Sequence, residues 1–299
     1  MSLNSSIFRG AFTALITPFK KDGSVDVDAL RALVRRQLDG GIDGLVPCGT
    51  TGESATMSEE EQLLVINTVV DEAAGQVPVI AGTGSNDTAK TIAFTRKVSK
   101  IDGIAAALVV TPYYNKPGQP ELWRHFTSIA DEGGLPVVLY NVPGRTAISL
   151  DTDTIASLAE HKAIVAIKEA SANLAFDSAI RNAVPDDFAL LSGDDFTTLP
   201  LIAIGGQGCI SVVSNLLPRD MSRMCSAALT GDMKTARQIH LAIQPLARIL
   251  FEKSNPIPVK AAASLLGWSG PTLRGPLYEP DGEFIARLQD ALSAYGLTS

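Results

Sequence analysis

Short apolar runs alternate with longer amphipathic stretches along most of this 299-residue chain, and that alternation limits its possible folds more than any other feature. The runs are apolar nearly throughout, as expected of parallel strands buried on both faces. Strands that alternate with helices in regular order predict a parallel sheet. The eight candidate strands are residues 13–18, 45–48, 77–81, 106–111, 136–140, 164–167, 189–191 and 209–213.

The stretches between these runs have helical periodicity. Ser58 and Glu61 have the spacing of a capping box, and Gly75 predicts the end of that helix. The regular order predicts an α/β fold, a closed (β/α)8 TIM barrel, which typically takes about 250 residues. An open doubly wound sheet is the alternative, but residues 82–87 lack the last glycine of its phosphate loop. The expected helices are residues 26–38, 58–74, 87–99, 121–132, 151–161, 175–183 and 196–204.

Strand signals stop near Met233, and residues 234–251, 258–266 and 283–295 have only helical patterns. We therefore expect a barrel over residues 1–231 and a C-terminal helical domain over residues 232–299. The uncharged stretch 196–218 is long enough to span a bilayer. Glycines at 205, 206 and 208 interrupt it, so a helix end, a turn and a buried strand are expected there instead.

Charge and cysteine content narrow the function classes. The chain has 25 Lys and Arg against 32 Asp and Glu, a net charge of −7, which does not favour binding to nucleic acid or to an anionic membrane. Its three cysteines have no CxxC spacing, so we expect reduced thiols. The first ten residues lack the pattern of a secretory signal. These features predict a cytoplasmic protein.

Polar residues gather where the predicted strands end, which is where barrel enzymes carry their chemistry. Lys168 closes the apolar run 164–167. A buried lysine is costly unless it is paired or neutral. It is therefore either an ion-pair partner of Glu169 or Asp194, or an amine whose pKa burial lowers until it can attack a carbonyl.

Other groups at these ends could assist such an amine. Tyr140 and Thr50 could pass protons through their hydroxyls, although core tyrosines with one wet end are common. Arg145 follows a Pro-Gly pair and is either a solvated loop charge or a bidentate carboxylate clamp. The three histidines lie in helical stretches without metal-ligand spacing, so a metal-dependent aldolase and a Ser-His-Asp triad are not expected.

From about Gly10 to the C-terminal helices, the chain resembles the dihydrodipicolinate synthase branch of the pyruvate-dependent class I lyase and aldolase family. Four segments carry the resemblance: residues 49–54 (GTTGES), 140–146 (YNVPGRT), 167–169 (IKE) and 255–260 (NPIPVK). It implies condensation of pyruvate with aspartate semialdehyde on the diaminopimelate route to lysine. It also implies a homotetramer built as a dimer of dimers, with no cofactor and no metal.

The resemblance also implies a role for individual residues. Lys168 would form the Schiff base, and Tyr140 would relay protons above it. Thr50 would link Tyr140 to Tyr114, which the family supplies from the neighbouring subunit of a tight dimer. Thr50 and Thr51 would hold the pyruvate carboxylate and Arg145 that of the second substrate. Gly193 and Ile210 would complete the substrate-binding set.

Two other functions compete with this reading. A sister enzyme, such as N-acetylneuraminate lyase or another 2-keto-acid aldolase, would keep Lys168 and Tyr140 but change the second pocket, and Arg145 favours the synthase. A catalytically silent barrel that senses small molecules is the second alternative. The presence of all five expected catalytic and carboxylate-binding groups argues against it.

Feedback-sensitive members of this family bind lysine in a cleft at the tight dimer interface. Matching positions here are Ser54, Ala55, Asn86 and Tyr113. Lys90 stands where a glutamate would pair with the α-ammonium of the effector, and Glu59 and Gln62 stand where histidines would be. We therefore expect weak or absent inhibition by L-lysine.

Overall fold

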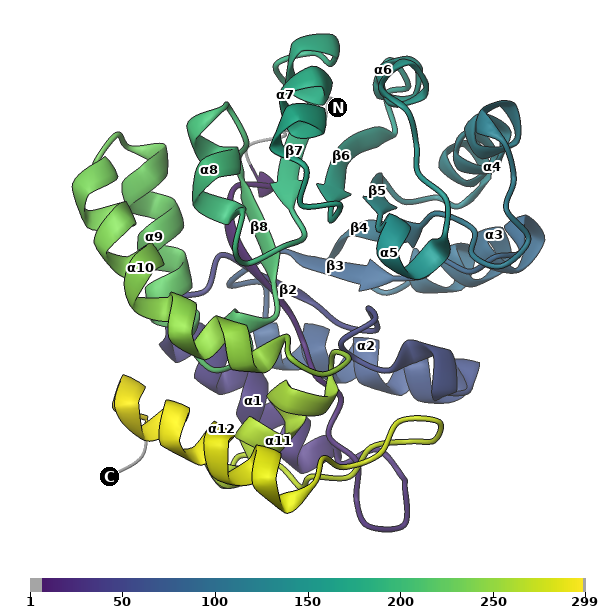
Figure 1. Ribbon diagram of the computed structural model, residues 1–299. Helices are drawn as coiled ribbons and strands as arrows, with labels where there is room; N and C mark the ends of the chain where they lie inside the picture. Colours follow the sequence, from purple (N-terminus) through teal and green to yellow (C-terminus); the bar gives the residue numbers. More distant parts are fainter. Residues whose placement is uncertain (1–6, 298–299) are drawn as a thin grey trace.

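The computed structural model of the protein describes residues 7–297 and contains eight parallel strands that close into a barrel in sequence order (Figure 1). The expected (β/α)8 barrel is confirmed, and the open doubly wound sheet is wrong. The expectation that the first ten residues are not a secretory signal concerns residues that lie largely outside the described range. The strands are β1 (Gly10–Ala14), β2 (Gly44–Val46), β3 (Val79–Gly82), β4 (Ile104–Val110), β5 (Val137–Asn141), β6 (Ile164–Glu169), β7 (Ala189–Ser192) and β8 (Gly208–Ser211).

Helices between the strands agree with the predicted ranges to within a few residues. The capping box is present, because Ser58 Oγ accepts a hydrogen bond from Glu61 N and Glu61 Oε2 accepts one from Ser58 N. The helix that it starts ends at Ala73, and Ala74 caps it just before Gly75. These helices are α1 (Val27–Asp39), α2 (Glu59–Ala73), α3 (Thr88–Val98), α4 (Gln119–Glu132), α6 (Thr152–Ala159), α7 (Leu174–Ala183) and α8 (Thr198–Ala203).

The first strand was predicted too late. Residues 15–18 are buried, and Leu15 N still bonds to Val46 O of β2, but Ile16 N bonds to the Asn215 side chain and the Thr17 hydroxyl to Gly52 O. Burial of residues 16–18 therefore does not reflect strand pairing. The strand starts instead at Gly10, whose φ of 98° and close approach to Asp43 suit glycine.

Two helices were not predicted. The helix α9 (Pro218–Leu229) closes the eighth βα unit, and the short α5 (Pro143–Thr146) follows β5. The buried residues Met221, Met224, Cys225 and Ala228 of α9 have helical spacing, so the pattern was available in the sequence. α5 is a single turn, too short for periodicity to reveal.

Two apolar layers form the core. One fills the barrel interior and includes Phe12, Ile80 and Leu191, and the other lies between the strands and the surrounding helices. Side chains alternate between these layers along each strand. Val138 and Ala166 face the interior, so Tyr140 and Lys168, two residues further along, face it as well.

The chain ends in three helices, α10 (Met233–Leu250), α11 (Ile257–Leu265) and α12 (Gly282–Tyr295). α10 packs against α9, and α12 packs against α10 and α11, so the segment covers one side of the barrel (Figure 1). Across residues 7–297, no helix has both the length and the apolar character needed to cross a membrane. The helices within residues 196–218 therefore do not form a membrane span, as expected from the glycines there.

Candidate active site

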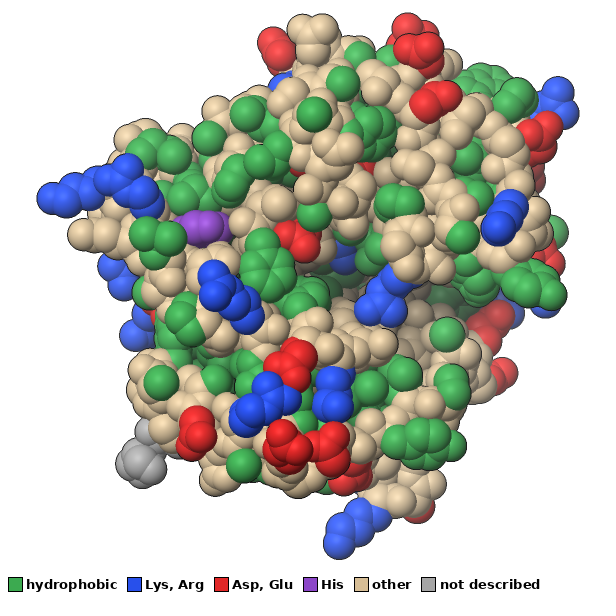
Figure 2. Space-filling model, in the orientation of Figure 1, with side chains coloured by type: hydrophobic (Ala, Val, Ile, Leu, Met, Phe, Trp, Pro, Cys, Tyr) green, Lys and Arg blue, Asp and Glu red, His purple; other side chains and the backbone are tan. Residues whose placement is uncertain are grey.

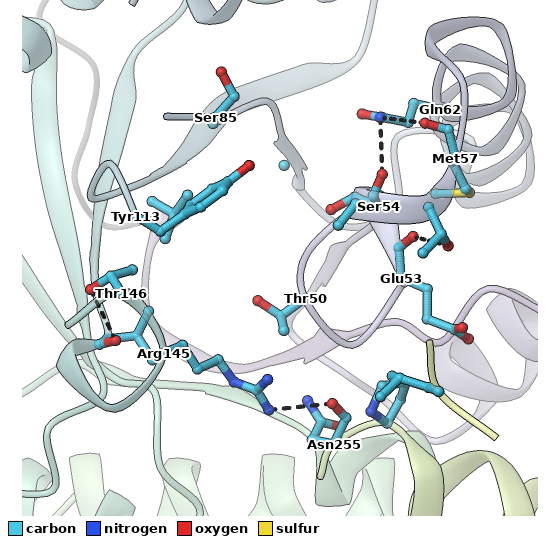
Figure 3. A pocket seen from close by; sticks show the side chains of 18 of the residues that line it. Thr50, Glu53, Ser54, Met57, Gln62, Ser85, Tyr113, Arg145, Thr146 and Asn255 are labelled. Atoms are coloured by element: carbon cyan, nitrogen blue, oxygen red, sulfur yellow. Dashed lines mark hydrogen bonds between the residues drawn. The ribbon is translucent and has the colours of Figure 1, made fainter. Parts of the chain in front are cut away.

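A cavity of about 830 Å³ opens where the strands end, as expected for a barrel. The loops after β2, β3, β4 and β5 line it, together with the segment that starts α11. Figure 2 shows this face hollowed near its centre, with hydrophobic, basic and acidic side chains around the hollow. In Figure 3, Thr50, Tyr113, Arg145 and Asn255 surround the space from different sides.

Lys168 is 6% exposed and lies opposite Tyr140 in the ladder between β5 and β6. Its Nζ is 4.2 Å from the centroid of the Tyr140 ring. The Glu169 carboxylate accepts hydrogen bonds from Asn141 Nδ2 and Ser171 N. The Asp194 carboxylate accepts them from the backbone of the loop after β7.

Within residues 7–297 no ion pair involves Lys168, so the ion-pair reading is wrong. The two carboxylates nearest to Lys168 in sequence are thus engaged by other donors, and the Lys168 amine lies against the Tyr140 ring. This environment suits an amine that attacks a carbonyl carbon.

Gly193 and Ile210 shape the space around the amine without adding polar groups. A Cβ at Gly193 would lie 3.0 Å from Lys168 Cε and 2.6 Å from Ala170 Cβ, so a larger residue would crowd the lysine. Ile210 is 1% exposed and belongs to the interior layer with Tyr140.

Thr50 and Tyr140 both line a smaller cavity of about 50 Å³ beside the large one. No hydrogen bond joins their hydroxyls in the described chain, so the predicted proton path is not closed here. Thr51 is 2% exposed, and its Oγ1 accepts a hydrogen bond from Asn255 Nδ2 at 2.9 Å. The two threonines thus occupy different environments, one open to the cavity and one held by the C-terminal segment.

Arg145 lies on α5 and lines the cavity. Its guanidinium points across the space to Asn255, and NH2 donates to Asn255 O at 3.3 Å (Figure 3). The Arg145 side chain is exposed, but it runs along the cavity wall toward Asn255. A cation in this position is suited to an anionic group of a ligand.

Tyr114 has φ 75° and is 89% exposed, and it does not line the cavity. The single chain therefore does not bring Tyr114 to Thr50. Its neighbour Tyr113 lines the cavity instead.

The residues of the expected effector cleft lie at one end of the same cavity. Ser54, Ala55, Lys90 and Tyr113 line it, and Asn86 Nδ2 donates to Tyr113 O at 3.2 Å. The two residues that replace histidines already have partners in this chain. Glu59 pairs with Lys97, and Gln62 Nε2 donates to the carbonyls of Ser54 and Met57.

Three carboxyl groups behind β6 and β7 have raised pKa values. Burial raises the pKa of Glu169. Burial, with the charges of Glu169 and Asp194, raises the pKa of Asp177 to about 7. Burial raises the pKa of Asp195 to about 6. Burial is thus the main cause of all three shifts.

Sequence reasoning gave no role to Asn255, Glu53 or Lys260, although all three lie in the quoted motifs. Lys260 is fully buried and its Nζ is 2.6 Å from Glu53 Oε1, across 207 positions of sequence. Their position in the quoted segments indicated a functional or structural role, but the sequence does not predict which residues they contact.

Comparison with known proteins agrees with this geometry. The model of the dihydrodipicolinate synthetase family matches residues 7–295. A curated 4-hydroxy-tetrahydrodipicolinate synthase of Maridesulfovibrio salexigens is 51% identical over 291 residues, covering 97% of this chain and 99% of the relative. The dihydrodipicolinate synthase structure from Aquifex aeolicus has a TM-score of 0.95 at 43% identity, covering 97% of this chain and 99% of the other.

A third relative has a solved structure with lysine bound. This synthase from Cyanidioschyzon merolae has a TM-score of 0.94 at 42% identity, covering 98% of this chain and 99% of the other. A family match over nearly the whole length, together with these identities, leaves no doubt about kinship. The chain belongs to the dihydrodipicolinate synthetase family.

Proposed function

We propose that this enzyme condenses pyruvate with L-aspartate 4-semialdehyde through a Schiff base on Lys168, the 4-hydroxy-tetrahydrodipicolinate synthase reaction. The observation that carries the proposal is the buried, unpaired Lys168 amine at the mouth of the barrel. The names of the curated relatives support the synthase over N-acetylneuraminate lyase and other sister aldolases.

The proposed chemistry needs a nucleophilic amine and a path for protons. Lys168 attacks the ketone carbon of pyruvate, and water leaves to give an imine. Loss of a proton from the methyl carbon gives an enamine, which attacks the aldehyde carbon of the second substrate. The amino group of that substrate then closes on the former ketone carbon and displaces Lys168. No step of this sequence requires a cofactor or a metal.

The other residues have supporting roles in the proposal. Tyr140 passes protons to and from the imine, with Thr50 next to it and Tyr114 of the partner subunit beyond. Thr50 and Thr51 bind the pyruvate carboxylate, and Arg145 binds that of the second substrate. Gly193 and Ile210 leave room for the adduct.

The proposed assembly is a homotetramer, a dimer of dimers. An 89% exposed tyrosine beside the cavity supports a role for Tyr114 across a subunit contact. We keep the barrel (1–231) and the C-terminal helical domain (232–299) as a proposed division. A cytoplasmic location is proposed from the cysteine pattern, and the three cysteines of the structure are free and buried.

Borohydride reduction in the presence of pyruvate tests the proposal. Mass spectrometry of the peptides should find the reduced pyruvate adduct on Lys168 and not on Lys260. Lys168→Met is the control and should give no adduct. An adduct on Lys260, or none on the wild-type enzyme, would overturn the mechanism.

A further inference from the structure

The loop that follows β2 has a strained backbone. Cys48 and Glu53, at its two ends, have φ values of 57° and 55°, in the left-handed region that residues other than glycine seldom adopt. Thr50 and Thr51 lie between them. Such a conformation persists only where surrounding contacts hold it, so the partners of this loop decide how its threonines are presented.

The C-terminal segment supplies much of that support. Lys260 of α11 is fully buried, and its Nζ pairs with Glu53 Oε1 at 2.6 Å. The other carboxylate oxygen of Glu53 accepts a hydrogen bond from Arg274 N at 3.0 Å. Both oxygens of Glu53 are therefore held by residues more than 200 positions away. This fixes the end of the loop next to the threonines.

Asn255, just before α11, reaches further toward the cavity. Its Nδ2 donates to Thr51 Oγ1 at 2.9 Å, and its backbone oxygen accepts from Arg145 NH2 at 3.3 Å. It thus contacts two of the groups assigned to carboxylate recognition. Asn255 is buried and lines the cavity in Figure 3, on the side where Arg145 ends.

The direction of the contact with Thr51 determines what that hydroxyl can do. An amide nitrogen only donates, whereas a threonine hydroxyl has one hydrogen to donate and two lone pairs to accept with. Asn255 Nδ2 occupies a lone pair of Thr51 Oγ1 and leaves its hydrogen free. None of residues 7–297 accepts that hydrogen. Thr51 follows Thr50 in the chain and is bonded to Asn255, and both of these neighbours line the cavity.

We propose that Asn255 is a positioning residue that makes the Thr51 hydroxyl a hydrogen-bond donor to the carboxylate of bound pyruvate. The inference rests on the proposed function and assigns a specificity role to the C-terminal segment. An amide donor at position 255 keeps the hydroxyl hydrogen on the substrate side. An acceptor there would take the hydrogen away from the substrate.

Asn255→Asp tests this directly, because it keeps the shape of the side chain and replaces the donor by an acceptor. We expect KM for pyruvate to rise at least about tenfold, since a hydrogen bond to a charged group is lost. Asn255→Ala removes the donor without adding an acceptor, so its effect on this KM should be smaller. If Asn255 served folding alone, the rise in KM for pyruvate would instead follow the fall in melting temperature from variant to variant.

A double-mutant cycle isolates the hydroxyl from the added charge and serves if the aspartate variant does not fold. In a Thr51→Val background, Asn255→Ala should leave KM for pyruvate unchanged, because the hydroxyl it positions is already absent. Equal effects of Asn255→Ala with and without the Thr51 hydroxyl would overturn the proposal. Asn67→Asp adds the same charge on the exposed face of α2. It is the control and should leave KM for pyruvate and KM for aspartate semialdehyde unchanged.

The outcomes separate this inference from the function on which it rests. If wild-type enzyme forms the pyruvate adduct on Lys168 and Asn255→Asp keeps its pyruvate KM within about twofold, the function stands and the inference is wrong. That result would mean that pyruvate binding does not depend on the Asn255 amide. If the wild-type enzyme forms no adduct, both are overturned.

Discussion

Two buried lysines in this chain have opposite surroundings. Lys260 lies against the carboxylate of Glu53, whereas Lys168 faces the ring of Tyr140 and forms no ion pair with any of residues 7–297. Burial lowers the pKa of Lys260, and the charge and hydrogen bond of Glu53 oppose this effect. An amine held by an ion pair is a poor nucleophile. The difference explains why only Lys168 is expected to form an adduct.

Arg145 is expected to serve the second substrate only. Arg145→Ala should lower kcat/KM for aspartate semialdehyde roughly ten- to a hundredfold. This corresponds to the about 1.5–3 kcal/mol that a charge-assisted pair contributes. The pyruvate adduct should still form. Arg145→Lys keeps the charge but not the planar guanidinium, so its kcat/KM should lie between those of the wild type and the alanine variant. Steady-state kinetics with each substrate varied decides the point, and unchanged turnover in the alanine variant would make Arg145 a surface charge.

Asp177 should make stability depend on pH. Burial raises the pKa of Asp177 in the folded chain to about 7, well above that of an exposed aspartate, so between these two values the folded state holds a proton that the unfolded state has lost. That contribution to stability is present at low pH and is lost as pH rises toward 7, by about 1.4 kcal/mol per unit. Asp177→Asn does not titrate.

The melting temperature of Asp177→Asn relative to wild type should therefore rise between pH 5 and pH 8. Thermal unfolding across that range measures it. A difference that stays constant with pH would show that Asp177 is already ionised in the folded chain at pH 5.

At the scale of elements, the loop after β2 and the segment from Asn255 to Arg274 behave as one unit. Arg274 donates to the carboxylate of Glu61 and to the carbonyls of Gly23 and Thr56, so it ties the segment to α2 as well. The site therefore depends on helices outside the barrel repeat. The barrel strands alone supply the amine and the tyrosine.

Lys260→Met should destabilise the protein strongly, because it leaves the buried Glu53 carboxylate without its counter-charge. A broken buried pair typically costs about 3–5 kcal/mol. Adding Glu53→Gln should recover part of the loss. Lys253→Met is a matched control, since the Lys253–Asp281 pair is 34% and 62% exposed and such pairs contribute up to about 1 kcal/mol. Denaturant unfolding compares them, and equal effects of the two lysine changes would contradict the argument.

For the whole molecule, the exposed Tyr114 predicts that activity needs a second subunit. If Tyr114 completes the site of a neighbouring chain, dissociation removes that group from every site. Specific activity should fall on dilution in step with the loss of dimer seen by sedimentation. A monomer that keeps full activity would count against this role for Tyr114.

Weak inhibition by L-lysine is expected for the assembled enzyme. Lys90 lines the end of the cavity where the effector would lie, and Glu59 is already paired with Lys97. A unit charge about 4 Å away in a medium of effective dielectric near 20 corresponds to roughly 4 kcal/mol before screening. A fraction of that repulsion weakens binding tenfold or more.

A titration of initial rate against L-lysine tests this expectation. Half-inhibition should need more than millimolar lysine, and Lys90→Glu should lower that concentration. Half-inhibition of the wild-type enzyme below a millimolar would show that the argument from Lys90 is wrong.

The barrel and the residues at its mouth could be predicted from local sequence patterns. Strand burial, helix periodicity and the capping box at Ser58 are local, so a few neighbouring residues are enough to predict them. The run ending at Lys168 predicted a buried amine in the same way. Local patterns failed where burial did not mean strand pairing, as in residues 16–18, and where a helix was a single turn, as in α5.

The contacts of the Lys168 amine and of the carboxylate loop depend on how distant parts of the chain pack together. Lys168 could have paired with Glu169, but closure of β5 beside β6 gives that carboxylate to Asn141. Folding of the last helices onto the barrel brings Lys260 to Glu53 and Asn255 to Thr51, across more than 200 residues. Such pairings depend on how the whole chain closes, and periodicity within a dozen residues has no information about them.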